Sequence, residues 1–346
     1  MHDSLRLGIV GGGAAAELCH LPAVRHVPEI GAVTLVDVDR ERAAELAGRF
    51  QIAKVATDYR DLFGQVDAVV VALPNFLHAP VAIEFLQQGI PVLVEKPMAL
   101  KASEAEAMVA AAGDLPLQVG LMYRFMHGPR IVKQAVEEAW LGNVESVTVE
   151  WGNVFRWPVA SGSFFSREYS GGGVLVDLGS HMFDLMAWVF GDLSLVAYCD
   201  DNQGGVEADC SATFEFESSG RAVRGTLVLS RLRKLSNVFR VVGDRFTLEY
   251  DVTSMDRVRL RPNTASAAVE PFLLDVGGRG QSGTEVYAAQ LRSFARAVLS
   301  GGRPEVPGDG CVAVTRLMEQ CYRDRQPARV PWVAAEESPA MLQVAK

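Results

Sequence analysis

Three side chains in the middle of this sequence could move a proton at a substrate oxygen. Lys96 directly follows a short apolar segment, and its positive charge could stabilise an alkoxide that develops on a bound substrate. Asp177 and His181 are four residues apart, so they would share one face of a helix. A carboxylate one turn from a histidine can orient the imidazole and stabilise its protonated form. Lys96, Asp177 and His181 are therefore the candidate catalytic residues.

The same residues have alternative interpretations. Lys96 could be a surface lysine paired with Glu95, and His181 could simply satisfy Asp184. An Asp-His-Asp set could also ligate a metal. Because no second cluster of His and Cys is visible, we predict that the site works without an ion.

A glycine-rich turn near the N-terminus predicts a dinucleotide site, with a plain structural turn as the alternative. The apolar segment 5–10 leads into residues 11–16, which fit G-x-G-x-x-(G/A). Gly11 permits the tight turn, and Gly13 lets a pyrophosphate approach backbone N–H groups at the start of a helix. Asp37 ends the next apolar segment, where its carboxylate can bind both hydroxyls of an adenosine ribose and repel a 2′-phosphate. The predicted cofactor is NAD; Arg40 lies near enough to soften the preference, so NADP is the alternative.

Residues after two further apolar segments should face the same crevice, because ligands bind at the carboxyl ends of parallel strands. Asn75 and His78 could hydrogen-bond the cofactor ribose or amide, although Asn75 could be only a helix cap and His78 only structural. The predicted cofactor-binding residues are Gly11, Gly13, Ala14, Ala15, Asp37, Leu73, Pro74, Asn75, His78, Glu95 and Lys96.

Aromatic residues between positions 151 and 169 suit the faces of sugar rings, although they could equally form a sheet core and a surface loop. Two polar residues where the first half ends, Tyr123 and Arg124, could also reach the crevice. The predicted substrate-binding residues are Tyr123, Arg124, Trp157, Asp177 and His181.

The order of the elements predicts two domains. Strands alternate with helices up to residue 122, which indicates an α/β domain with a doubly wound parallel sheet, a Rossmann domain over residues 1–122. Residues 123–346 contain strands with few helices between them, which indicates an α+β domain with a large, mostly antiparallel open sheet. A strong helix is predicted over residues 174–190, and two C-terminal helices could pack back on the first domain. In the first domain, Ser103 is predicted to cap a helix over residues 104–112.

Composition excludes several classes of protein. The 346 residues carry a formal net charge of −9, which argues against a broad nucleic-acid or anionic-membrane surface. The apolar runs are too short to span a bilayer, and the N-terminus leads directly into the first strand. Five cysteines without a C-x-x-C pattern indicate free thiols in a reducing compartment, so we expect a cytoplasmic protein.

An open sheet with one exposed apolar face would be unstable alone. The strands between residues 210 and 251 are therefore expected to bury such a face in a homodimer or homotetramer.

Together these motifs resemble the Gfo/Idh/MocA family of glucose-fructose oxidoreductases, inositol dehydrogenases and rhizopine-catabolism proteins. The resemblance rests on the turn at 8–16 with Cys19–Ala23, on Asp37, Pro74-Asn75, His78, Glu95-Lys96-Pro97, Tyr123–Phe125, Gly171–Asp184 and Gln290–Phe294. It implies a Rossmann domain followed by an open-sheet domain, and NAD(P)-dependent redox chemistry on sugars, cyclitols or their derivatives, nucleotide-sugars included. The family's catalytic lysine falls on Lys96, and its Asp and His fall on Asp177 and His181.

The resemblance leaves two alternatives to a dehydrogenase or ketosugar reductase. One is an NAD-sensing regulator without turnover, against which the presence of Lys96, Asp177 and His181 argues. The other is a glycosidase-like protein that oxidises and reduces bound NAD within each turnover.

Overall fold

A six-stranded parallel sheet forms the N-terminal half of the described chain. The structure is a computed structural model and describes residues 4–155, 158, 162–263, 272–274 and 280–328. The strand order is β3-β2-β1-β4-β5-β6, the doubly wound order of a dinucleotide-binding domain. The strands are β1 (Leu5–Val10), β2 (Ile30–Val36), β3 (Lys54–Ala56), β4 (Ala68–Val71), β5 (Val92–Val94) and β6 (Leu117–Val119). This confirms the predicted Rossmann fold.

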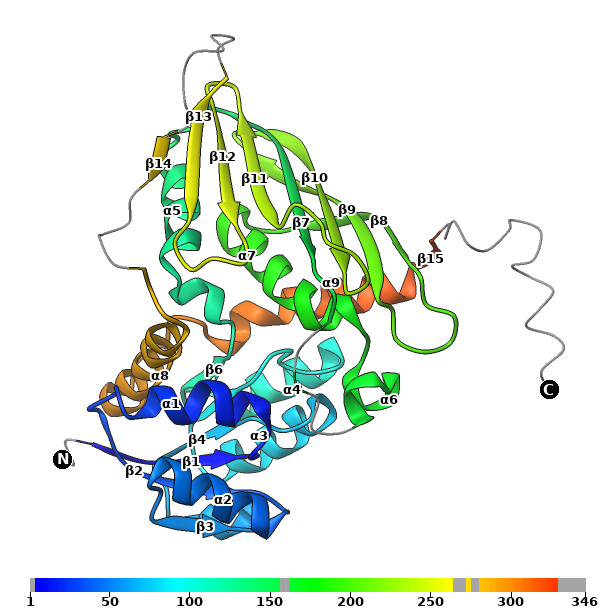
Figure 1. Cartoon of the computed structure of the whole chain (residues 1–346). Coiled ribbons are helices and arrows are strands. Elements are labelled where there is room, and N and C mark those ends of the chain that lie inside the picture. The colour runs from blue at the N-terminus through cyan, green and yellow to red at the C-terminus, as the bar shows by residue number, and fades with distance from the viewer. Residues whose placement is uncertain (1–3, 156–157, 159–161, 264–271, 275–279, 329–346) are drawn as a thin grey trace, which may run out of the picture.

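Helices cover both faces of this sheet (Figure 1). They are α1 (Leu21–Val24), α2 (Arg40–Phe50), α3 (His78–Gln87) and α4 (Ala102–Ala112), with η1 (Ala16–His20), η2 (Tyr59–Leu62) and η3 (Asn75–Leu77) before or between them. All four residues of β4 are buried, as expected of a parallel strand that is covered on both sides.

A second sheet, nine-stranded within the described residues, dominates the C-terminal half. Its order is β14-β13-β12-β11-β7-β10-β9-β8-β15. The strands are β7 (Val144–Gly152), β8 (Ser194–Asp200), β9 (Asp209–Ser218), β10 (Arg221–Ser230), β11 (Val238–Gly243), β12 (Phe246–Asp251), β13 (Val258–Pro262), β14 (Phe272–Leu274) and β15 (Gln326–Pro327). Neighbours pair antiparallel except β7 with β10 and β8 with β15, which confirms the predicted mostly antiparallel sheet.

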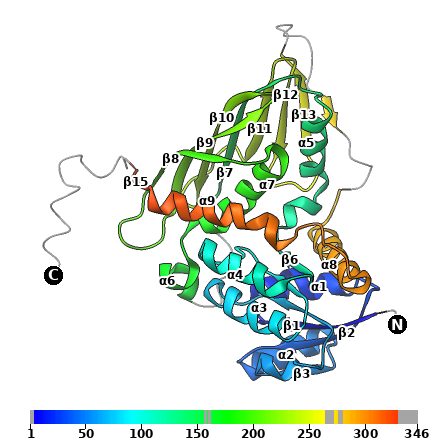
Figure 2. The same cartoon turned by 180° about the vertical axis from the view of Figure 1, so that it is seen from behind.

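Among the described residues, helices cover only one face of this sheet (Figures 1 and 2). They are α5 (His127–Glu137), α7 (Ser180–Phe190) and α9 (Val312–Arg323), with α6 (Arg167–Ser170), α8 (Gly283–Ser300), η4 (Met122–Phe125), η5 (Gly162–Phe165), η6 (Leu175–Gly179) and η7 (Gly308–Cys311) completing this half. Alternate residues of β9 are buried, and Phe214 on this strand contacts Phe183 of α7.

The other face of the large sheet mixes polar and apolar residues, so it is less apolar than expected: Val228, Val238 and Val242 lie among threonine and charged side chains. Thr148, Thr213 and Thr226 lie side by side on β7, β9 and β10. Ion pairs cross the strands beside them, Arg224 with Glu215 and Arg240 with Glu249. Strand alternation alone does not reveal whether the outward residues are apolar enough to need cover.

The two C-terminal helices contact the first domain. Helix α8 packs against α1, and α9 packs against α4. Leu291 and Phe294 of α8 belong to the same buried cluster as Leu21 and Leu35. The chain therefore returns to the first sheet after building the second.

Two local predictions need correction. Helix α4 begins at Ala102, and the Glu104 carboxylate accepts the N–H groups of Leu100 and Lys101, so Ser103 lies inside the helix and does not cap it. The predicted helix 174–190 is present, but residues 175–179 form a π-helical turn before α7.

One described stretch, Arg167–Phe190, has the length and composition to cross a membrane. Of its most apolar window, 72% is buried inside the protein, where α7 packs on the large sheet.

Candidate active site

The glycine-rich turn opens into a cleft of about 760 Å³. Gly11 has a φ of +105°, and a Cβ there would lie 2.3 Å from the Ala72 carbonyl oxygen, so the turn requires glycine. A Cβ at Gly13 would meet nothing within 4 Å, so the backbone is open to the cleft at this position. The helix starts at Ala14, and its first N–H groups have no partner within the helix. These features fit a dinucleotide pyrophosphate.

Most of the predicted cofactor-binding residues line this cleft. They are Gly11, Gly13, Ala14, Ala15, Asp37, Leu73, Pro74 and Asn75. Asp37 accepts the N–H groups of Gly12 (2.7 Å) and Asp39 (2.9 Å), so its carboxylate is fixed at the end of β2. The Asn75 side-chain amide donates to the Ser170 carbonyl at 2.8 Å, which joins the cleft to α6 of the second domain.

The basic residue at the cleft is Arg42, whereas Arg40 does not line it. Arg42 donates to Glu17, to Glu45 and to the Gly12 carbonyl oxygen. Its guanidinium is therefore already occupied beside Asp37.

Three predicted cofactor residues do not line the cleft, namely His78, Glu95 and Lys96. His78 is buried, and its ring nitrogens lie 2.7 Å from the Pro97 carbonyl oxygen and 2.8 Å from that of Leu73. The structure thus places His78 as a bridge between the ends of β4 and β5. Glu95 is also buried, with one oxygen 2.7 Å from His20 Nε2 and the other accepting the Lys96 N–H. Burial by itself would raise the pKa of Glu95, but the hydrogen bond from His20 holds it below its usual value.

Lys96 and Asp177 meet across the two domains. Lys96 Nζ donates to the backbone oxygen and to Oδ1 of Asp177, both at 2.9 Å. Arg231 donates to the other carboxylate oxygen of Asp177. Burial would raise the pKa of Asp177, but the charges of Lys96 and Arg231 outweigh it and hold that pKa well below its usual range. Asp177 is therefore a carboxylate shared by two cations.

The expected hydrogen bond from Asp177 to His181 is absent among the described residues. Asp177 lies in a π-helical turn that precedes the helix of His181. Both carboxylate oxygens are already engaged by Lys96 and Arg231.

His181 is a neutral imidazole in this environment. Burial, followed by the charge of Lys96, lowers the pKa of His181 to about 3. Its Nδ1 is buried and has no hydrogen-bond partner in the part of the chain that is described. The ring packs against Tyr123 (5.1 Å between centroids) and Trp151 (6.5 Å). His181 is thus held by aromatic packing and not by a carboxylate.

The predicted substrate residues separate into different places. The Tyr123 hydroxyl donates to the Val252 carbonyl at 2.7 Å, so only its ring faces His181. Arg124 forms two hydrogen bonds with buried Asp184, at 3.0 and 2.6 Å, which places it in an interior ion pair. The sequence cannot reveal this pairing, because the partners are sixty positions apart. Trp157 lies outside the described residues.

Sequence reasoning missed Arg231 and the loop that supports it. Arg231 directly follows β10, so the rule that singled out Lys96 after β5 could have found it. Its backbone N–H donates to Ala208, in the loop that connects β8 and β9.

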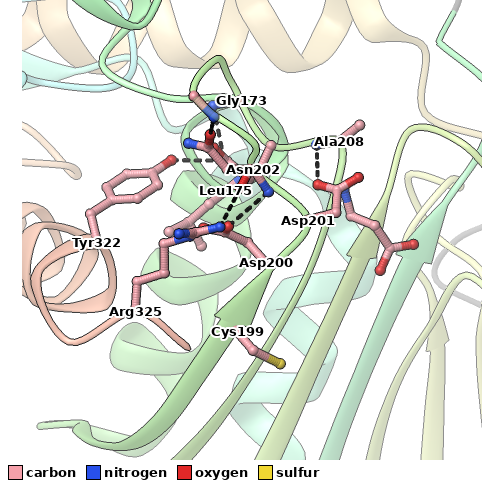
Figure 3. A network of polar contacts seen from close by, with 12 residues as sticks. Gly173, Leu175, Cys199, Asp200, Asp201, Asn202, Ala208, Tyr322 and Arg325 are labelled. Carbon is pink, nitrogen blue, oxygen red and sulfur yellow. Dashed lines mark hydrogen bonds and ion pairs between the residues drawn. The ribbon is translucent and has the colours of Figure 1, made fainter. Parts of the chain in front are cut away.

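That loop also binds Gly173 and Leu175 (Figure 3), which begin the turn that carries Asp177. Oε1 of buried Glu207 accepts the N–H groups of Gly173 and Leu175 and the Tyr322 hydroxyl. Asp201 accepts the N–H of Ala208 at 2.8 Å. The loop therefore supports Asp177 from one side and Arg231 from the other.

Within the described residues, no group of three or more His, Cys, Asp or Glu side chains could hold a metal ion. Asp177 and Asp184 are both paired with cations.

The first domain is doubly wound and carries a nucleotide cleft, and the open-sheet domain after it places Asp177 beside Lys96. This arrangement is that of two-domain nucleotide-dependent oxidoreductases. Sequence comparison specifies the family. Residues 5–123 match a profile described as an oxidoreductase family with an NAD-binding Rossmann fold, and residues 130–249 match the GFO/IDH/MocA C-terminal domain. The chain belongs to the Gfo/Idh/MocA oxidoreductase family, as its motifs indicated, and its first domain is an NAD-binding Rossmann domain.

Relatives include a putative UDP-kanosamine synthase oxidoreductase subunit from Amycolatopsis mediterranei, 33% identical over 54% of this chain and 52% of the relative. The chain thus spans about half the length of this relative. A D-xylose 1-dehydrogenase (NADP(+)) from Haloferax volcanii is 26% identical over 93% of this chain and 98% of the relative. A levoglucosan dehydrogenase solved with NADH and levoglucosan superposes with a TM-score of 0.81 at 20% identity, over 93% of this chain and 98% of that one. The similarity to the levoglucosan dehydrogenase structure shows the fold alone.

We predict that Asp184→Asn lowers the free energy of unfolding by about 3–5 kcal/mol, because it leaves the Arg124 charge buried without a partner. Glu305→Gln is the matched control, since it breaks the exposed ion pair with Arg130 and should cost less than about 1 kcal/mol. Urea denaturation of both variants measures the difference. Equal small losses would show that Arg124 does not depend on Asp184.

We also predict that the protein prefers NAD over NADP, because Asp37 repels a 2′-phosphate. Asp37→Ser alone should admit NADP weakly, since Arg42 remains paired with Glu17. Adding Glu17→Gln should free Arg42 and raise kcat/KM for NADP by about a further tenfold, as for one charge-assisted hydrogen bond.

Steady-state kinetics with NAD and with NADP tests whether kcat/KM for NADP rises from the wild type to Asp37→Ser and again to the double variant. Asp37→Ser with Glu45→Gln is the control, because Arg42 then keeps its bond to Glu17. A wild-type preference for NADP would contradict the assignment of Asp37.

Proposed function

We propose that this chain is an NAD-dependent oxidoreductase acting on a secondary alcohol or ketone of a sugar, cyclitol or nucleotide-sugar. The observation that carries the proposal is the contact of Lys96 with Asp177 across the two domains, close to His181, whose pKa responds to both charges. The family supports oxidoreduction in general, and the names of the relatives support sugars as substrates.

NAD, when bound, would supply the hydride acceptor for the alcohol carbon or, in its reduced form, the hydride donor for the ketone carbon. In oxidation, the proton of the alcohol oxygen passes to His181, whose neutral imidazole has a nitrogen lone pair to receive it. Lys96 has a third N–H beyond the two that bind Asp177, and it donates this to the same oxygen. The products are the ketone, the reduced cofactor and the proton on His181.

Lys96→Ala and His181→Ala should each lower kcat by about 100-fold or more, in line with losses of acid–base and charge-stabilising groups. NADH affinity should change little, because the cleft residues that bind the cofactor are separate. Lys96→Arg should rescue poorly, since a planar guanidinium does not replace a compact ammonium. The measurement is turnover with a panel of sugars, cyclitols and nucleotide-sugars, beside NADH fluorescence titration.

The pH profile tests whether the His181 imidazole is neutral over the working range of pH. Because the pKa of His181 is about 3, kcat/KM for oxidation should show no loss from His181 protonation between pH 8 and 5. A loss of oxidation centred near pH 6.5 that disappears in His181→Asn would refute the neutral buried imidazole. NADH binding without turnover of any substrate would favour the nucleotide-sensing alternative.

We further infer a homodimer or homotetramer assembled through the large sheet. Its uncovered face carries Thr148, Thr213 and Thr226 side by side, with the Arg224–Glu215 and Arg240–Glu249 ion pairs beside them, so a second copy could pack on this part of the face without breaking those pairs. All five cysteines are free, which supports the expected cytoplasmic location.

Light scattering at micromolar concentration should therefore give a mass of two or four chains. Thr226→Arg should shift this mass toward one chain, because it places an unpaired charge in the centre of the face. Lys54→Glu, on β3 of the other sheet, should leave the mass unchanged. A wild-type monomer would rule out the assembly.

A further inference from the structure

Arg231 adds a second positive charge to the site, and the proposed hydride and proton transfers do not use it. We propose that Arg231 determines specificity by binding a carboxylate or phosphate group of the substrate, so that the enzyme acts on acidic sugars. This inference rests on the proposed oxidoreductase function and names its substrate class.

The accessible surface of the site carries more positive than negative charge. The side chains of Lys96 and Arg231 are each 20% exposed, and Asp177 between them is 18% exposed. Glu95 does not balance them there, because its carboxylate is buried against His20. Two cations therefore share one carboxylate, and an anionic substituent on the substrate would complete the pairing.

The Arg231 guanidinium keeps N–H donors that no described residue uses. A guanidinium has five N–H donors, and here Nη2 binds Asp177 while Nε is buried without a partner. Nη1 makes no hydrogen bond to any described residue. The end of the guanidinium formed by Nη1 and the second Nη2 proton is thus available, and this geometry suits two oxygens of a carboxylate or phosphate.

Arg231 is held in place before any substrate binds. Its guanidinium carbon lies 5.3 Å from the centroid of the Phe155 ring, and its backbone bonds to Ala208 and Phe155. Phe155 in turn contacts Phe164, at 5.2 Å between centroids, and Phe164 lines the cofactor cleft. Arg231 is therefore fixed on the side of the site that faces the cleft, as a specificity residue should be.

The alternative is that Arg231 only positions Asp177. In that case its loss would lower turnover of acidic and neutral sugars by the same factor. If Arg231 binds the substrate anion, its loss changes the ratio between them.

The experiment compares matched pairs: D-glucuronate with D-glucose, D-galacturonate with D-galactose, and glucose 6-phosphate with glucose. NADH formation gives kcat/KM for each, and quenching of NADH fluorescence in the NADH-loaded protein gives Kd where a sugar binds without turnover. The variants are Arg231→Gln, Arg231→Lys and, as control, Arg233→Gln, which removes an exposed arginine paired with Asp209.

In the wild type we expect at least one acidic sugar, in the uronate or the phosphate arm, to exceed its neutral partner by about tenfold or more, as for one charge-assisted hydrogen bond. Arg231→Gln should abolish this ratio, Arg231→Lys should keep part of it, and Arg233→Gln should leave it intact. The ratio is insensitive to a general loss of activity in a damaged variant.

Two failures are distinguishable. Two results would overturn the role of Arg231 and leave the oxidoreductase proposal standing. One is that neutral sugars are bound or turned over as well as every acidic sugar. The other is a ratio of acidic to neutral sugar that Arg231→Gln does not change. Arg231-dependent binding of an acidic sugar without any redox change of the cofactor would overturn the oxidoreductase proposal and support the anion site.

Discussion

The carboxylate of Asp177 is the interaction on which the site depends. It receives Lys96 from the end of β5 and Arg231 from the end of β10, so one buried anion joins the two sheets. Removing a carboxylate between two half-buried cations would leave both without their partner, which is costly in an environment of low dielectric. The π-helical turn at 175–179 gives Asp177 its place, and Glu207 holds the backbone where that turn begins.

This arrangement divides the electrostatic roles of the site. Asp177 is committed to the cations, so His181 has no carboxylate partner and remains neutral between Tyr123 and Trp151. A carboxylate bonded to the imidazole would instead have stabilised its protonated form and raised its pKa.

Much of the fold and the cofactor cleft could be predicted from the sequence, because these features are local. The run 11–16, the strand before it and Asp37 after the next strand lie within one βαβ unit, and the chemistry of each residue depends on its immediate backbone. The long helix over 174–190 was equally clear from its apolar pattern. The composition of the outer face of the large sheet could not be predicted in this way, because it depends on which residues the neighbouring strands bring together.

The sequence by itself therefore determined the class of domain and the glycine turn, and it indicated Lys96, Asp177 and His181 as candidate site residues. Only the tertiary structure decided which of them touch. Arg124 pairs with Asp184, and His78 lies between the ends of β4 and β5. Asp177 accepts a hydrogen bond from Arg231, a residue 54 positions away. The reason is physical: a side chain's partner, burial and charge state depend on groups that approach it through space, and residue spacing describes only its neighbours along the chain.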